Sequence, residues 1–107
     1  MTVDEMAAQL GLQVVHSEPD RPYTGVFCCD LLSVAMANAP EDGAWVTVMG
    51  NRNVVAVASL TDVAVVVLAH GAQYDEDALE AARGKVTLLR SEEPIYETAV
   101  KVGALLK

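Results

Sequence analysis

Apolar residues fall into short runs along the chain, and the spacing within each run predicts its structure. The runs at 12–16, 44–49 and 63–69 are rich in β-branched residues and have few polar positions, which is typical of buried strands. Two further β-prone segments begin at Tyr23 and cover 85–89. Glycine, proline or acidic clusters separate these runs, as expected for turns between strands and helices.

Helix-end signals mark the first half of the chain. Thr2 and Glu5 have the spacing of a capping box before a short helix that Gly11 ends. Asp30 is expected to cap a second helix over 31–38, because a short carboxylate can accept from the exposed amides of a first turn.

The second half of the chain contains two further helix signals. Three acidic residues open a helix over 75–83, where they complement the helix dipole, and Gly84 follows it. Ser91 is expected to cap the last helix, in which apolar residues recur at helical spacing up to Leu106.

The segment 53–60 fits two structures. Its apolar residues allow a hairpin with 63–69, turning at residues 61–62. We favour a helix because Asn51 can cap it, because alanine is frequent in it, and because strands and helices then alternate regularly. Under this interpretation 63–69 becomes a central parallel strand, buried on both faces.

This alternation predicts an α/β fold. Residues 1–107 are expected to form one domain, with a small, mostly parallel sheet of four to five strands flanked by helices. A chain of 107 residues can build a single core, but not two lobes around a cleft.

Charge and composition exclude several classes of function. The formal net charge is -8 and the pI is about 4.5, which removes the attraction that dominates nucleic-acid binding and disfavours anionic membranes. No apolar run reaches the roughly 20 residues that span a bilayer, and Asp4 and Glu5 replace the basic start of a signal peptide. We therefore expect a cytoplasmic protein that binds neither nucleic acid nor membrane.

The cysteines and histidines give little support for metal or redox chemistry. Cys28 and Cys29 are adjacent, and neighbouring strand residues face opposite sides, so we expect one buried and one outward thiol. His16 and His70 are expected to be hydrogen-bonded structural residues. We predict no metal site and no cofactor.

The strand ends offer a candidate binding site. In open parallel sheets, ligands sit beyond the carboxyl ends of the strands, near helix N-termini. There Arg52 could meet the charge of a small anion or nucleotide, while Gly50 and Gly71 could allow close approach. The opposing interpretation is that these residues only make turns and caps. The candidate ligand residues are Gly50, Asn51, Arg52, His70, Gly71, Arg90 and Ser91.

An enzyme is the least supported interpretation. His70 is the only candidate base at the strand ends, and no nucleophile or carboxylate stands at a recognisable spacing from it. The chain has no nucleophile elbow and no phosphate-binding loop with lysine. We therefore predict no catalytic residues.

A helix over 53–60 has no polar face and must be covered on more than one side. A second copy of the chain could cover it through Val54, Val57 and Ala58. Alternatively, neighbouring segments of the same chain cover it. We favour a homodimer through this helix.

Residues 23–102 resemble a DRTGG domain. Residues 50–52, Gly-Asn-Arg, stand where that family commonly has Gly-Asp-Arg, and 69–71, Ala-His-Gly, stand where it has Thr-Gly-Gly. Residues 30–33 and 96–99 also match the family pattern. The resemblance implies a small α/β sandwich akin to the N-terminal domain of HPr kinase, and a non-catalytic, commonly dimeric module.

We expect a homodimeric regulatory or sensory module without catalysis that binds a small anionic metabolite or nucleotide at the strand ends. The alternative is a protein-interaction adaptor that has lost ligand binding and acts through its acidic surface or its apolar helix.

Overall fold

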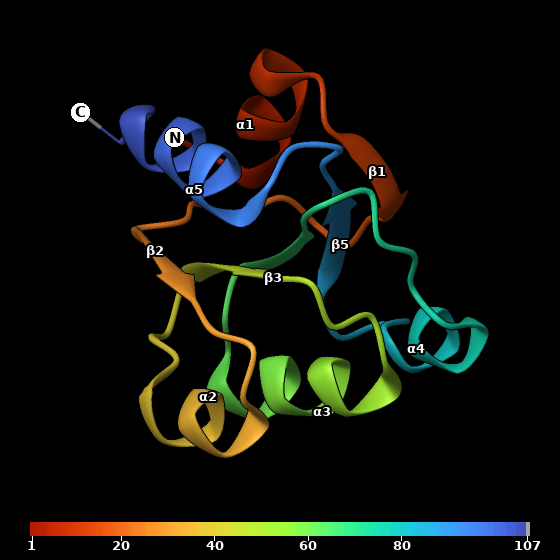
Figure 1. Cartoon of the computed structure of the whole chain (residues 1–107). Helices are drawn as coiled ribbons and strands as arrows, with labels where there is room; N and C mark the ends of the chain where they lie inside the picture. Colours follow the sequence, from red (N-terminus) through yellow and green to blue (C-terminus); the bar gives the residue numbers. More distant parts are fainter. Residues whose placement is uncertain (107) are drawn as a thin grey trace.

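The computed structural model describes residues 1–106 and consists of a five-stranded sheet with helices on both faces (Figure 1). This confirms the predicted α/β class. The elements are α1 Val3–Leu10, β1 Gln13–His16, β2 Gly25–Cys28, α2 Leu32–Asn38, β3 Gly43–Thr47, α3 Arg52–Thr61, β4 Val65–Leu68, α4 Glu76–Ala81, β5 Thr87–Arg90 and α5 Ile95–Ala104. None of the helices within residues 1–106 is both long and apolar enough to cross a membrane.

The strands lie in the order β1-β5-β4-β3-β2. From β2 to β5 neighbouring strands are parallel, with Trp45 of β3 paired between Phe27 of β2 and Val66 of β4. β1 is antiparallel to β5, and a β-bulge lies between Val14 and His16. The sheet therefore has two edges, one formed by β1 and the other by β2.

The segment favoured as a helix is α3. Its N-cap is Asn51, whose side-chain oxygen accepts a hydrogen bond from Val54 N–H at 3.0 Å, and the helix ends at Asp62 in the left-handed conformation. Because residues 52–61 are helical and do not pair with β4, the hairpin interpretation is wrong. The cap supplies the partner that the first turn needs, and the following strand buries both faces.

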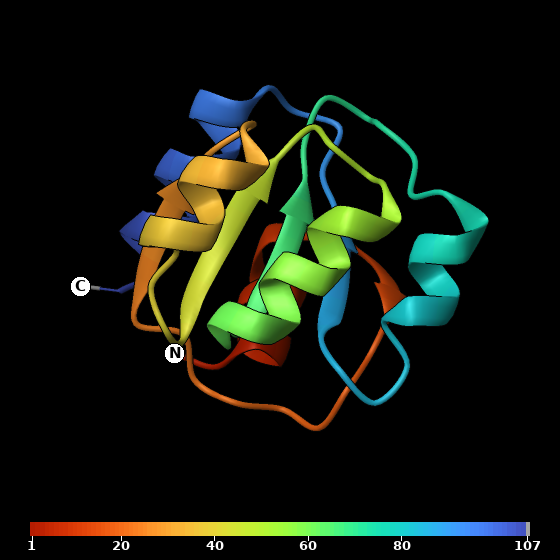
Figure 2. The same cartoon turned by 90° about the horizontal axis from the view of Figure 1, so that it is seen from below.

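The helices form two layers. The crossovers that join β2, β3, β4 and β5 in sequential order are of one hand, which places their helices on the same face. α2, α3 and α4 cover one face, and α2 and α3 run side by side across it (Figure 2). α1 and α5 cover the other face (Figure 1). Side chains alternate accordingly, with Trp45 facing the first layer and Val46 the second.

The N-terminal helix agrees with its predicted signals. Thr2 and Glu5 form the reciprocal hydrogen bonds of a capping box, and Gly11 ends α1 with a φ of 65°. The connection between β1 and β2 is attached to α5, because the buried hydroxyl of Tyr23 donates to the carbonyl of Val102 at 2.7 Å.

Two predicted caps are wrong. α2 begins behind Leu31, and the carboxylate of Asp30 instead accepts from Thr47 Oγ1 at 2.7 Å and from Val48 N–H at 2.9 Å. Likewise, α5 begins behind Pro94 rather than Ser91. Asp30 therefore binds an element distant in sequence, which a local pattern cannot reveal, whereas the Ser91 hydroxyl bonds Glu93 N–H and Thr98 Oγ1 nearby.

Candidate functional site

The strand ends of β4 and β5 are where the fold could open a crevice. α4 follows β4 onto one face of the sheet and α5 follows β5 onto the other, so the two connections diverge. Backbone hydrogen bonds nevertheless join the two connections. His70 N–H donates to Glu93 O at 2.8 Å, and Gly71 N–H donates to Ser91 O at 2.9 Å. These bonds close the crevice between the two connections.

Arg90 binds the loop after β4 through its guanidinium group. It lies in β5 rather than in the following loop, and its side chain is only 10% exposed. Its Nε donates to Ala72 O and its Nη2 to Gly71 O, both at 2.7 Å, and Nη1 donates to Gln13 Oε1 at 2.5 Å. Glu92 adds a carboxylate 3.5 Å away. The guanidinium therefore has protein partners on three of its nitrogens and holds the loop after β4.

The two glycines of the candidate site have structural roles, Gly50 in packing and Gly71 in a turn. A Cβ at Gly50 would lie 3.0 Å from the Cα of Tyr74 and would also meet the carbonyl oxygen of Gln73. Gly71 has a φ of 65°, which favours glycine, and only the exposed carboxylate of Glu92 lies near the position of an added Cβ. The backbone of Gln73 and Tyr74 therefore leaves no room for a ligand at Gly50, whereas glycine at 71 is explained by the conformation of the turn.

Tyr74, in the connection between β4 and α4, attaches this connection to the sheet. Its hydroxyl is buried, 2.9 Å from Leu89 O and 3.2 Å from Val66 O. Burial raises its pKa far above the usual tyrosine value, so the hydroxyl stays protonated. It therefore serves as a structural donor.

Ser91 and Asn51 also serve the fold. The hydroxyl of Ser91 is buried, lies 2.9 Å from Thr98 Oγ1, and accepts from Glu93 N–H at 3.1 Å. Asn51 caps α3 through Val54. The cap interpretation therefore agrees with the structure for Asn51, whereas Ser91 stabilises the turn before α5 rather than capping the helix.

Arg52 and His70 are the exposed members of the candidate set. Arg52 shares a shallow hollow with Asp77 and Glu80, so its nearest charged neighbours there are carboxylates. His70 adopts a φ of 61° at the end of β4, with its side chain in solvent. The expectation of a hydrogen-bonded histidine holds for His16, whose Nε2 lies 2.5 Å from Glu18 Oε2, and not for His70.

The predicted dimer residues lie inside a single chain. Val54 and Ala58 are 0% exposed and Val57 is 7% exposed, because α2 and α4 pack on either side of α3. The prediction of a contact surface through these residues is therefore wrong, and the alternative that the same chain covers them is right. Neighbouring elements cover the face of α3 that carries Val54, Val57 and Ala58, while its opposite face, with Asn53, Ala56 and Leu60, is exposed.

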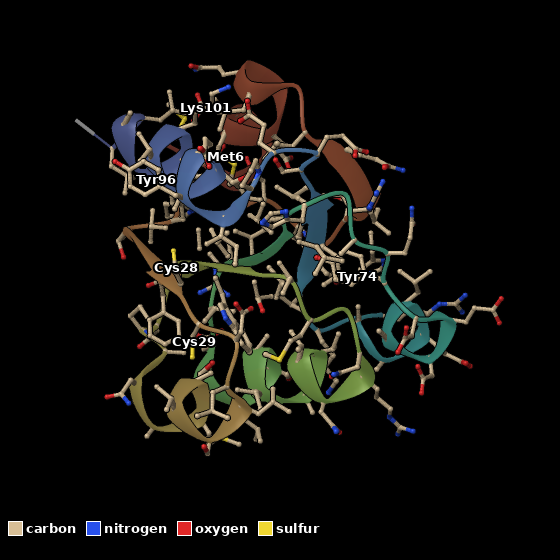
Figure 3. All side chains as sticks on the ribbon, in the orientation of Figure 1. Met6, Cys28, Cys29, Tyr74, Tyr96 and Lys101 are labelled. Carbon is tan, nitrogen blue, oxygen red and sulfur yellow. The ribbon has the colours of Figure 1, made fainter. Side chains whose placement is uncertain are left out.

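The cysteines lie at the β2 edge. Cys28 is exposed and points toward α5, whereas Cys29 is half-buried and points toward α2 (Figure 3). Partial burial and the nearby Asp30 carboxylate raise the pKa of Cys28 above the ordinary thiol value. Within residues 1–106, no group of three or more histidine, cysteine or acidic side chains could hold a metal ion.

The β2 edge also carries the surface feature that sequence reasoning missed. Beside Cys28, a shallow groove of about 470 Å³ runs between β2 and α5. Tyr96 is 74% exposed and Val100 is 49% exposed on its α5 side, and Tyr96 lies above Cys28 in Figure 3. The residues lining the groove are Val26, Cys28, Tyr96, Ala99, Val100, Gly103 and Ala104. A sequence signal existed, because Tyr96 and Val100 are four residues apart and so share one face of the last helix.

Comparison with known proteins adds no assignment: no family model matches the chain, and no curated protein is significantly similar to it.

Proposed function

We propose that this chain is a non-catalytic regulatory module that acts by binding polypeptide chains through its β2 edge. The observation that carries this proposal is a contrast in hydrogen bonding. At the ends of β4 and β5, the polar groups of Arg90 and Ser91 are used internally. At the β2 edge, an apolar groove lies beside a strand that has a neighbour on one side only.

An exposed strand edge beside apolar pockets is suited to peptide recognition. An added strand gains main-chain hydrogen bonds from the edge, and alternate side chains of that strand enter pockets. The groove between β2 and α5 provides such a pocket, with the phenol ring of Tyr96 at its border. This favours the adaptor function over anion binding, for which Arg52 is poorly placed beside Asp77 and Glu80.

We also propose that the chain is a divergent member of the DRTGG family with a cytoplasmic location. Two features support the membership: the α/β class, and the position of the family-like turns at the ends of neighbouring strands β3 and β4. The two free cysteines are in keeping with a reducing compartment.

The test is a selection of displayed seven-residue peptides against the immobilised chain. We expect extended apolar peptides that bind the native chain and lose at least tenfold affinity for the Tyr96→Asp variant. Their binding should shift amide resonances of β2 and α5. Leu60→Asp, at a 73% exposed site on α3, is the matched control and should bind normally.

Calorimetric titration of nucleotides and phosphorylated metabolites tests the competing function. We expect no heat that depends on Arg52. Saturable binding that Arg52→Ala abolishes, together with a failed peptide selection, would overturn the proposal in favour of an anion sensor.

A further inference from the structure

The two edges of the sheet are protected to different degrees. β1 carries a β-bulge between Val14 and His16 and is followed by the charged and polar stretch 17–21. Its side chains are engaged, since Gln13 accepts from Arg90 and His16 pairs with Glu18. Bulges and charges are common devices against edge-to-edge association, so β1 is poorly suited to pair with another strand.

β2 lacks these devices. It is in regular register with β3 over its four residues. Cys29 N–H donates to Val46 O, and bonding residues alternate along a parallel ladder. The N–H and C=O groups of Val26 and Cys28 therefore point away from β3, toward the open side of the sheet.

The lack of charge at the β2 edge allows two copies of this acidic chain to meet there. The chain has a net charge of -8, so two copies repel each other unless they meet through an uncharged surface. The only charged residue in 24–40 is Asp30, and its carboxylate binds Thr47 and Val48. The groove residues beside β2, all within the described part of the chain, carry no charge.

We propose that the β2 edge pairs with the β2 edge of a second copy, antiparallel about a two-fold axis, to form one continuous ten-stranded sheet. This inference rests on the proposed function, because it names the partner for the same surface. An edge strand is complementary to its own antiparallel copy, so the contact is isologous and closes as a dimer.

The hydrogen bonds already made fix the register. A two-fold axis at Val26 would pair Cys28 with Thr24, whose N–H is already donated to Asp42 O at 2.9 Å. An axis at Phe27 pairs each Val26 with the Cys28 of the other copy and uses all of the free groups in β2. The two Phe27 residues then face each other as a non-hydrogen-bonded pair.

The flanking helices extend this contact. A two-fold axis perpendicular to the sheet leaves corresponding faces of the two copies on the same side. The α5 helices of the two copies therefore lie next to each other on one face, and the α2 helices on the other. α5 brings the exposed side chains of Tyr96 and Val100, and α2 exposes Leu31 and Val34. Apolar side chains therefore lie on both faces of the new strand pair.

The test measures mass and amide exchange together on the native chain. Sedimentation equilibrium at micromolar concentration should give a dimer. The amides of Val26 and Cys28 should exchange with solvent slowly in the dimer, and at least tenfold faster after dilution to the monomer. A monomeric mass overturns the inference, as does a dimer in which these two amides exchange freely.

Cys28→Lys should give a monomer with an unchanged circular dichroism spectrum, because its side chain is exposed and its N–H bonds no native partner. Leu60→Lys carries the same charge change at an exposed site on α3 and should remain a dimer. A dimer that survives Cys28→Lys also counts against edge pairing. A monomeric chain that still binds selected peptides refutes self-association alone, whereas a monomer that binds none refutes the proposed function as well.

Discussion

The ends of β4 and β5 and the edge of β2 border the same sheet, yet they differ in how their hydrogen-bonding groups are used. At the strand ends, Arg90, Ser91 and the amides of His70 and Gly71 all have partners in the same chain. At the edge, the backbone groups of Val26 and Cys28 face outward. The polar groups between the two connections are therefore used within the chain, although a hollow of about 290 Å³ lies beside them, with Arg90, Ser91 and Lys101 in its wall. The backbone groups at the β2 edge are not used in this way.

This difference shows that residue type alone is a poor guide to a binding site. Arginine, serine and glycine at strand ends are typical of anion sites, but they equally satisfy the carbonyls and turns of a closed loop. A site needs groups with unused bonding capacity, and here that capacity lies in the backbone of β2.

The largest effect is expected at Arg90. Arg90→Ala removes the donors to the carbonyls of Gly71 and Ala72 and should lower the free energy of unfolding by about 3 kcal/mol. Urea unfolding followed by circular dichroism measures this loss. Arg52→Ala is the matched control and should change stability by less than about 0.5 kcal/mol, since Arg52 is exposed. Equal effects of the two substitutions would contradict the assignment of Arg90 to the fold.

An intermediate effect is expected at Gly50. Gly50→Ala places a methyl group against the backbone of Gln73 and Tyr74 and should cost roughly 1–3 kcal/mol. Gly25→Ala, at a position with no atom within 4 Å of the added carbon, should leave stability nearly unchanged. A fully stable Gly50→Ala protein would mean that the loop after β4 is free to move away, and the strand ends would then be open after all.

The smallest effect is on the reactivity of Cys28. Its pKa is raised by burial and by Asp30, so the reactive thiolate is scarce near neutral pH. In a Cys29→Ser background, the rate of alkylation by iodoacetamide should keep rising above pH 9.0, the pKa of an ordinary thiol. The raised pKa also means that the stability contributed by the neutral thiol is present below pH 9.0 and is lost as the pH rises. A rate that levels off below pH 9.0 would show that Cys28 is better solvated than the groove geometry implies.

Most of the fold could be predicted from the sequence. The order of helices and strands follows from local signals such as the capping box at Thr2 and the cap at Asn51. The choice of helix for residues 53–60 needed one further argument, regular alternation, because an apolar run fits both structures.

The candidate site could not be predicted to the same degree, because its side chains bind partners distant in sequence. Arg90 binds Gln13, and Asp30 binds Thr47, across separations that no local pattern encodes. The burial of Val57 was expected, but it was assigned to a second copy, since the packing of α2 and α4 around α3 is not visible in the sequence. The position of β2 at an edge is likewise a property of the sheet order.

The sequential order of β2 to β5 bears on how the domain is completed during synthesis. Each new strand joins beside the last one made, so α2, α3 and α4 can cover their face progressively as the ribosome releases them. The opposite face stays half-bare until residues 95–104 emerge, because α5 shields it together with α1. A nascent chain stalled before that point would expose apolar side chains on this face of the sheet. Chaperone binding would be most useful at that stage of synthesis.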